Sequence, residues 1–170
     1  VIESVKEIDA IGHRVLHGGE VYKASTLVTD EVIKTVMDLK ELGPLHNPPQ
    51  AVAMKTCQEV FGKDIPMVGV FDTAFHQTMP AKAYMFGVPY EYYEKYSVRR
   101  YGFHGTSHRY ITKRYGELKG KLEGTRIITC HLGNGSSISA IKDGKVMDTS
   151  MGLTPLDGFI MGTRSGGIDP

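Results

Sequence analysis

The segment that most constrains the fold is the short apolar run Ile65–Phe71, which is followed directly by Asp72. A run of this length and composition is typical of a strand that is buried on both faces in a parallel sheet. Ligands of open α/β sheets bind at the carboxyl ends of the strands, so Asp72 is a candidate functional residue. The alternative is that Asp72 only caps the turn or helix that follows.

Two helices are predicted before this strand. Residues 29–43 form the first, with Thr29 as its N-cap and Gly43 as its stop. The second begins with Asn47 as N-cap and Pro48 at the first helical position, and it runs to about residue 60. A further strand that leads into a loop is predicted within residues 1–20, so the first half of the chain is α/β.

The second half changes character. Residues 73–101 are predicted to be mostly loop with short helical turns, and a helix follows that is capped by Thr106 or Ser107. Its predicted apolar stripe consists of Ile111, Tyr115 and Leu118. Three strands then form an antiparallel meander over residues 126–131, 138–142 and 145–148, with Asp143-Gly144 as a hairpin turn and a glycine-rich loop after the last strand. The change in pattern predicts two parts, 1–75 and 76–170.

Composition excludes several classes of protein. The chain of 170 residues has 20 basic and 19 acidic side chains, so it has no strong positive field for nucleic acid or for an anionic membrane. No apolar run approaches the ~18 residues of a membrane span. Two cysteines, far apart in sequence, favour a reducing compartment, and we expect a cytoplasmic protein.

Residues 133–137, Gly-Asn-Gly-Ser-Ser, are the first candidate for phosphate binding. Glycines let backbone N–H groups approach an anion, although the same composition also makes an ordinary hairpin turn. Arg14 and Arg164 lie in polar, glycine-rich segments and could bind a carboxylate or phosphoryl group, or could instead form ordinary ion pairs. No Walker A motif is present in the sequence.

His104 and His108 are four residues apart, a spacing that could place two zinc ligands on one helix face. Gly105 occupies the place of the glutamate in the HExxH motif, which favours a hydrogen-bonded histidine at a helix start. His104 could also donate a hydrogen bond to a developing negative charge.

Six strings in order carry a resemblance to a known family: HRVLHGGE, GPLHNP, VFDTAFH, YGFHGTSH, HLGNGSS and MGTRSGGIDP, at residues 13–20, 43–48, 70–76, 101–108, 131–137 and 161–170. Together they resemble the acetokinase family, of the sugar kinase and actin superfamily. The resemblance covers nearly the whole chain. It implies an α/β, actin-like ATPase (ribonuclease H-like) fold, with residues 1–75 as the C-terminal part of the first domain and 76–170 as the N-terminal part of the second.

The family transfers the γ-phosphoryl group of ATP to acetate, giving acetyl phosphate and ADP, and runs in reverse. The resemblance implies catalytic roles for Asp72, His104 and Arg164. It implies substrate binding by Arg14 and His46, an apolar pocket formed by Leu16, Leu45, Phe103 and Pro155, and an ATP-phosphate loop formed by His131, Leu132, Gly133, Asn134 and Gly135. Because a carboxylate acceptor is ionised at neutral pH, Asp72 is expected to orient substrate or metal-bound water rather than to remove a proton.

The resemblance also implies Mg²⁺ as cofactor and a homodimer. It places the metal ligands in family segments that this sequence lacks, so we expect no metal ligand here and little activity from the 170 residues alone. Three alternatives remain: a propionate kinase, a nucleotide-binding module without turnover, and a zinc protein built on His104 and His108.

Overall fold

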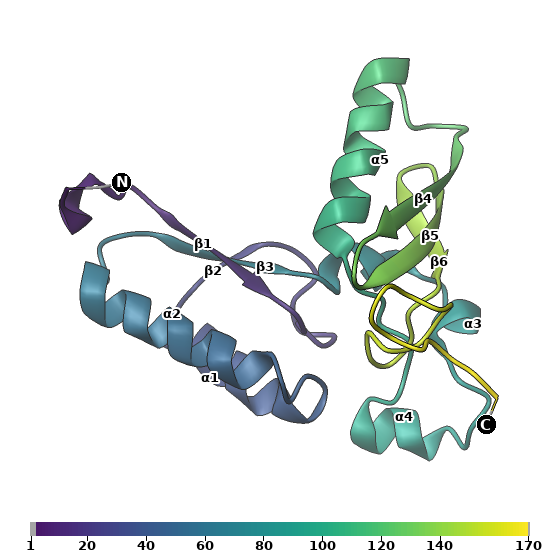
Figure 1. Cartoon of the computed structure of the whole chain (residues 1–170), viewed down its shortest axis with the longest axis horizontal. Helices are drawn as coiled ribbons and strands as arrows, with labels where there is room; N and C mark the ends of the chain where they lie inside the picture. Colours follow the sequence, from purple (N-terminus) through teal and green to yellow (C-terminus); the bar gives the residue numbers. More distant parts are fainter. Residues whose placement is uncertain (1–2, 170) are drawn as a thin grey trace. The chain divides into compact units, whose positions relative to one another are not determined.

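The computed structural model describes residues 3–169, and the chain divides into two compact units between Ala74 and Phe75. Figure 1 shows the elements of each unit in sequence colours. The fold is mixed α/β, as the sequence predicts, and each unit has its own three-stranded sheet.

The sheet of the first unit is built around β3 (Met67–Phe71), which lies between its two partners. β1 (Ile11–Val15) pairs with β3 in parallel, with Val15 opposite Phe71, and the short β2 (Thr26–Leu27) pairs antiparallel on the other side. The predicted strand is therefore confirmed. Its burial on both faces is wrong, because Met67, Gly69 and Phe71 are buried while the alternating valines are only half-buried.

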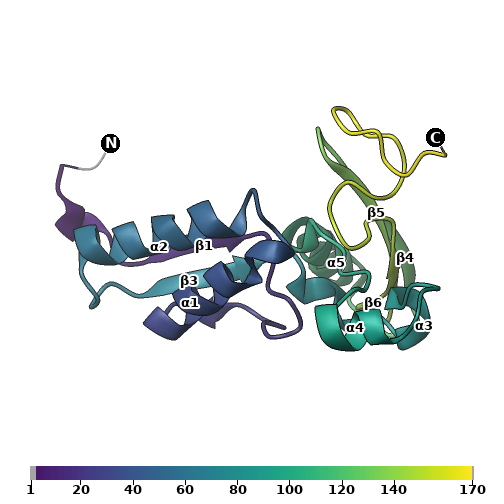
Figure 2. The ribbon, with the colours of Figure 1, turned by 90° about the horizontal axis from the view of Figure 1, so that it is seen from below.

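Two helices cover one side of this sheet, as Figures 1 and 2 show. They are α1 (Asp30–Asp38) and α2 (Asn47–Phe61), and a 3-10 turn at Leu39–Glu41 follows α1. The Thr29 hydroxyl accepts a hydrogen bond from the Val32 N–H at 3.3 Å, so the predicted cap is confirmed. The core between helices and sheet consists of Val15, Val32, Val36, Ala51, Met54 and Phe71.

The predicted cap of α2 is wrong by one residue. His46 is the N-cap and Asn47 is the first helical residue, with proline in the first turn. The physical reason is that the Asn47 side chain is fully buried and bonds to the backbone of His17 and Val36. It therefore links distant segments rather than the first turn of its own helix.

The second unit begins with loops, the short helices α3 (Ala81–Tyr84) and α4 (Glu91–Tyr96), and then α5 (Gly105–Lys119). An antiparallel meander follows, with β4 (Arg126–Leu132), β5 (Ser136–Lys142) and β6 (Lys145–Thr149) in that order. Asp143 and Gly144 both have positive φ, as a two-residue hairpin turn requires. The predicted meander and its turn are confirmed.

The start and the buried face of α5 differ from the prediction. His104 is the N-cap, with a left-handed φ of 58°, and the Ser107 hydroxyl bonds to His131 instead of capping the helix. The buried face of α5 carries His108 and Thr112, whereas Ile111 and Leu118 of the predicted stripe are exposed. A buried polar face, on which His108 is hydrogen-bonded to the sheet, thus takes the place of the predicted apolar stripe.

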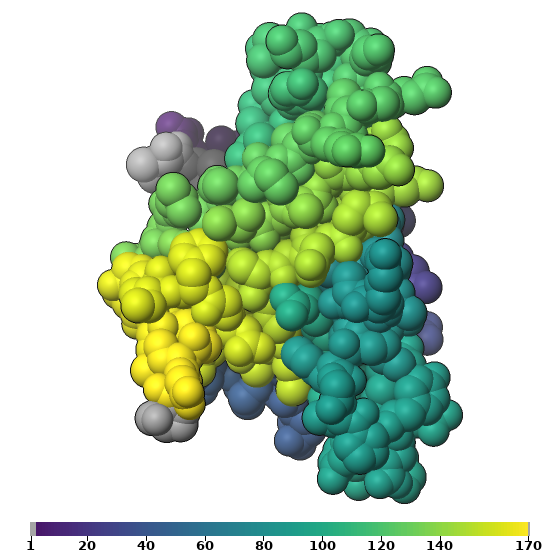
Figure 3. Space-filling view, turned by 90° about the vertical axis from the view of Figure 1, so that its right-hand side faces the viewer, coloured from purple at the N-terminus to yellow at the C-terminus, as the bar shows by residue number. Residues whose placement is uncertain are grey.

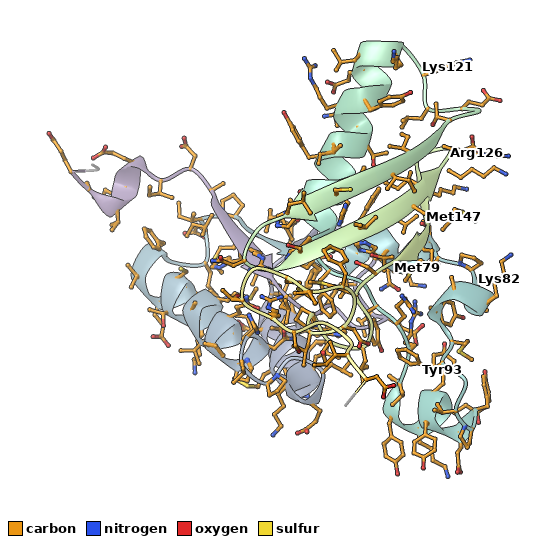
Figure 4. All side chains as sticks on the ribbon, turned by 45° about the vertical axis from the view of Figure 1, so that its right-hand side comes forward. Met79, Lys82, Tyr93, Lys121, Arg126 and Met147 are labelled. Atoms are coloured by element: carbon orange, nitrogen blue, oxygen red, sulfur yellow. The ribbon has the colours of Figure 1, made fainter. Side chains whose placement is uncertain are left out.

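The sheet of the second unit has an inner face toward α5 and an outer face that Figure 3 looks onto. Among the described residues, no helix covers this outer face, and Ile128 and Leu132 are 66% and 75% exposed. Arg126 and Met147, labelled in Figure 4, belong to the same surface. No helix within residues 3–169 is long and apolar enough to cross a membrane.

Candidate active-site residues in the two units

The first unit presents an arginine–aspartate pair at the carboxyl ends of its parallel strands. Arg14 lies near the end of β1, and Asp72 directly follows β3. Arg14 Nε donates to Asp72 Oδ1 at 3.1 Å, and Arg14 Nη2 donates to Asp72 Oδ2 at 2.6 Å. Both carboxylate oxygens therefore hold the guanidinium in a bidentate contact, rather than capping the turn that follows.

Burial is unequal across this pair. The Asp72 side chain is 3% exposed, whereas that of Arg14 is 57% exposed. The hydrogen bond to Asp72 raises the pKa of Arg14, so the guanidinium stays charged. An arginine has five N–H donors, and the contact with Asp72 leaves some of them for an anion. The buried Asp72 carboxylate thus holds the partly exposed Arg14 guanidinium at the carboxyl ends of the strands.

Side-chain hydrogen bonds fix the loop that follows Arg14. The Leu16 N–H donates to Gln50 Oε1 at 3.0 Å, and the Gly18 N–H donates to Thr73 Oγ1 at 3.1 Å. Asn47 Oδ1 accepts from the His17 N–H at 3.2 Å, and Asn47 Nδ2 donates to the His17 carbonyl at 3.0 Å. Side chains of α2 and of Thr73 therefore fix this loop, and the fixed loop keeps Arg14 in place.

The remaining predicted residues of the first unit differ in exposure. Leu16 is buried, and His46 is the half-buried N-cap of α2. Leu45 is 83% exposed, so within this unit it forms no apolar pocket wall of its own.

The second unit gathers His104, His108 and His131 in one cluster, with the Ser137 hydroxyl between the first two. Ser137 Oγ, on β5, lies 2.8 Å from His104 Nδ1 and 2.8 Å from His108 Nε2. The rings of His104 and His131 stack with centroids 4.0 Å apart, and His131 Nδ1 lies 2.9 Å from Ser107 Oγ. The first turn of α5 and the inner face of the sheet therefore build one histidine cluster.

His108 lies at the centre of this cluster and is fully buried. Its Nδ1 lies 2.7 Å from Thr129 Oγ1 on β4. Desolvation by burial, with smaller contributions from His104 and His131, lowers the pKa of His108 to about 4. His108 is consequently a neutral imidazole at neutral pH, bonded to a hydroxyl on each side.

The glycine-rich loop between β4 and β5 is shaped around Arg164. A Cβ atom at Gly135 would lie 2.7 Å from Arg164 Nη1, so only glycine lets the guanidinium approach this closely. Arg164 Nη1 also donates to the Pro155 carbonyl at 2.9 Å, and the Thr163 N–H donates to the Asn134 carbonyl at 3.2 Å. A cationic group thus lies against a glycine turn, an arrangement that fits a nucleotide phosphate.

Metal binding finds little support in either unit. Within residues 3–169, no group of three or more histidine, cysteine, aspartate or glutamate side chains could hold a metal ion. Hydroxyls engage both ring nitrogens of His108, so the structure favours the hydrogen-bonded alternative over a zinc pair with His104. The described residues therefore do not fit a metal centre of their own.

The predicted residues fall into two sets. The first unit holds Arg14, Leu16, Leu45, His46 and Asp72, and the second holds Phe103, His104, His131, Leu132, Gly133, Asn134, Gly135, Pro155 and Arg164. Contacts join Arg14 to Asp72, His104 to His131, and Arg164 to Pro155 and Gly135. Phe103 is fully buried, whereas Leu132 is exposed.

Sequence reasoning missed the role of Thr129 and that of Ser137 as a bridge between histidines. For Ser137 a signal existed, because Ser137 and Ser139 flank Ile138, the residue with which the predicted strand begins. Period-two placement puts both serines on one face. That face proves to be the buried one, which is unusual for serine and marks a polar network.

Comparison with known proteins places these features in a family. The sequence pattern of the acetokinase family matches residues 1–170. Acetate kinases from Thermoanaerobacterium thermosaccharolyticum and Thermotoga maritima are 60% and 59% identical over the whole chain. The chain spans about 42% of the length of these two curated relatives.

Solved structures agree. Acetate kinase from Porphyromonas gingivalis matches 99% of this chain, and 42% of its own length, with a TM-score of 0.92 and 52% identity. A propionate kinase from Francisella tularensis matches 98% of this chain, and 43% of its own length, with a TM-score of 0.92 and 48% identity. With matching sequence, fold and full coverage of its residues, this chain belongs to the acetokinase family.

Proposed function

We propose that this chain carries part of the active site of an acetate kinase, which reversibly transfers the γ-phosphoryl group of ATP to acetate. The match of all 170 residues to the acetokinase family carries the proposal. The two clusters support it, because phosphoryl transfer depends mainly on positioning and on neutralising negative charge. Each unit supplies cationic or donor groups held by buried partners.

On the acceptor side, Arg14 binds the carboxylate of acetate or the phosphoryl group of acetyl phosphate. Asp72 serves this binding by accepting both hydrogen bonds that orient the guanidinium. A base is not required, because acetate is already ionised at neutral pH. Leu16, Leu45, Phe103 and Pro155 are proposed to surround the methyl group, with His46 as a further polar contact.

On the nucleotide side, the loop of His131, Leu132, Gly133, Asn134 and Gly135 binds phosphate oxygens of ATP. Arg164, held against Gly135 and the Pro155 carbonyl, and His104 stabilise the charge on the transferring group. Mg²⁺, expected for the family, would neutralise phosphate charge when bound. The described residues supply no cluster for it.

Propionate kinase is the second candidate, because a propionate kinase is among the structures similar to this chain. One methylene in an apolar pocket changes discrimination by only ~1–3 kcal/mol, so relative rates with acetate and propionate decide between them.

The homodimer and the cytoplasmic location expected from the sequence stay proposals. Sedimentation of the active enzyme tests the first, and cell fractionation tests the second.

A chimera tests the proposed function. Residues 1–170 replace the matching segment of Thermotoga maritima acetate kinase, which is 59% identical to this chain. We expect ATP-dependent formation of acetyl phosphate from acetate. Replacing Arg14 or Arg164 with alanine should lower kcat/KM by about 100-fold or more, because each removes a charged donor to the reacting group.

Lys95→Ala serves as the control, since this residue forms an exposed ion pair with Glu91 on α4. A chimera that folds, binds ADP and makes no acyl phosphate would support the alternative of a nucleotide-binding module. A preference for propionate by more than about tenfold in kcat/KM would instead assign propionate kinase.

A further inference from the structure

The sequence contains two asparagines, and their surroundings differ. Asn47 is fully buried, and its side chain bonds to the backbone of His17 and Val36. Asn134 is exposed in the loop between β4 and β5. Within residues 3–169 its side-chain amide forms no hydrogen bond, so no described residue fixes the orientation of this amide.

The residue that follows each asparagine also differs. Pro48 follows Asn47 and has no backbone N–H, whereas Gly135 follows Asn134. The backbone nitrogen of the following residue can attack the side-chain carbonyl carbon of an asparagine and close a cyclic imide. Glycine permits this ring closure best, because it has no Cβ to hinder the attack and adopts many backbone conformations.

Two features of the loop favour attack by the Gly135 nitrogen. Its N–H donates to no acceptor in the described part of the chain, so no hydrogen bond has to break before the attack. Arg164 lies beside Gly135, because a Cβ atom there would be 2.7 Å from Arg164 Nη1. The attacking nitrogen must lose its proton, and a nearby cation favours the loss of a proton.

We propose that Asn134 is a site of spontaneous modification, at which its side-chain amide becomes a carboxylate. The Gly135 nitrogen forms a bond to Asn134 Cγ, and the Cγ–Nδ2 bond breaks, so that ammonia leaves with the proton of the Gly135 nitrogen. Water then opens the cyclic imide at either of its carbonyl carbons. The products are aspartate and isoaspartate, and in the latter the backbone continues through the side chain.

The modification adds a negative charge to the loop that we propose binds ATP. This consequence rests on the proposed function, whereas the modification itself does not. The new carboxylate repels phosphate oxygens, and it lies near Arg164, the cation proposed to meet the transferring phosphoryl group. We therefore expect the activity of the chimera to fall as the carboxylate forms. Bound ADP should slow the modification, because its phosphates engage the N–H groups of the loop.

Peptide mapping of the 170-residue chain tests the proposal. The chain is kept folded in warm, mildly alkaline buffer, and trypsin then releases the peptides 127–142 and 41–55, which contain Asn134 and Asn47. Mass spectrometry detects the replacement of the amide by a hydroxyl, and chromatography separates aspartyl from isoaspartyl peptides. We expect progressive loss of the unmodified 127–142 peptide to both products, and an unchanged 41–55 peptide.

Asn134→Gln is the matched control, because the longer side chain keeps the amide but closes the corresponding ring far more slowly. Its 127–142 peptide should stay unmodified, and modification at the same rate as the wild type overturns the proposal. An intact Asn134 in the folded wild-type chain also overturns it, even where the same peptide reacts after unfolding in urea. Aspartate without isoaspartate contradicts the cyclic route, since direct hydrolysis gives only aspartate.

The link to nucleotide binding has its own readout in the chimera. If saturating ADP does not slow the modification in an active chimera, the N–H groups of this loop do not hold phosphate, and the expected effect on activity is overturned. The modification is read without turnover. An inactive chimera that is modified as expected therefore refutes the proposed function and leaves the modification site standing.

Discussion

At the residue scale, the buried carboxylate of Asp72 orients the exposed guanidinium of Arg14. In Asp72→Asn, one oxygen that accepts from Arg14 becomes an amide that donates, so the bidentate contact is lost. Hydrogen bonds to charged groups contribute about 1.5–3 kcal/mol, and we expect the free energy of unfolding of the chain to fall by about that amount. In the chimera, kcat/KM for acetate should fall by at least about tenfold.

Urea denaturation and steady-state kinetics check these two effects. Asp38→Asn is the control, because Asp38 forms an exposed ion pair with Lys34 on α1 and should change neither quantity measurably. Near-wild-type turnover in Asp72→Asn would refute the role given to this carboxylate.

His108 predicts a pH dependence of stability. Its pKa lies at about 4 in the folded chain against 6.5 for a free histidine, so the unfolded chain binds the extra proton between these values. Stability is therefore complete above pH 6.5 and falls as the pH drops toward 4, by roughly 3 kcal/mol in total. Burial lowers the pKa of His13 as well, so it contributes in the same direction.

Denaturation with urea at several pH values measures this slope. In His108→Gln the difference in unfolding free energy between pH 7 and pH 5 should shrink, whereas in His13→Gln most of it should remain. An unchanged slope in His108→Gln would mean that His108 titrates normally in the folded chain.

At the scale of elements, a substitution in the loop between β4 and β5 should lower activity and leave stability almost unchanged. In Gly135→Ala, the new Cβ meets the end of a flexible arginine side chain rather than backbone, so Arg164 can move aside at little cost to the fold. Arg164 then leaves the place where we propose that it meets the phosphoryl group. We expect kcat/KM of the chimera to drop by about tenfold or more, with the melting temperature almost unchanged.

Gly87→Ala is the matched control, since a Cβ there meets nothing within 4 Å. It should alter neither activity nor melting temperature. Gly135→Ala with full activity would show that the close approach of Arg164 to this glycine is not used in the reaction.

The same scale shows what sequence patterns could and could not predict. The predicted strands, the Asp143-Gly144 turn and the Thr29 cap follow from local preferences, and the structure confirms them, whereas the short β2 was not predicted. The caps predicted for α2 and α5 fail, because Asn47 and Ser107 bond to residues distant in sequence, His17 and His131. Partners of this kind are set by tertiary packing, which no local pattern contains.

At the scale of the whole molecule, the family motifs named the candidate side chains but not the groups that hold them. The resemblance named Arg14, Asp72 and His104 one by one. The contact of Thr129 with His108, in contrast, depends on the register of β4 against β5, which places Thr129 opposite Ser139. Register emerges from the paired sheet, and so Thr129 carried no signal in the sequence.

The outer face of the β4–β5–β6 sheet leads to a prediction about the 170-residue chain in solution. Ile128 and Leu132 on β4 and Met147 on β6 are exposed, and the exposed Cys130 lies between the first two on β4. Exposed apolar patches favour association, because contact removes apolar surface from water. We expect the chain to self-associate as its concentration rises, measured by sedimentation velocity under reducing conditions.

Ile128→Thr keeps a β-branched side chain in the strand and makes this surface more polar, so it should shift association to higher concentration. Val60→Thr, at an exposed site near the end of α2, is the control and should leave the sedimentation profile unchanged. If Ile128→Thr associates as the wild type does, another surface drives self-association. A chain that stays monomeric at every concentration would show that the outer face is too small or too interrupted by Arg126 and Lys142 to bind a second copy.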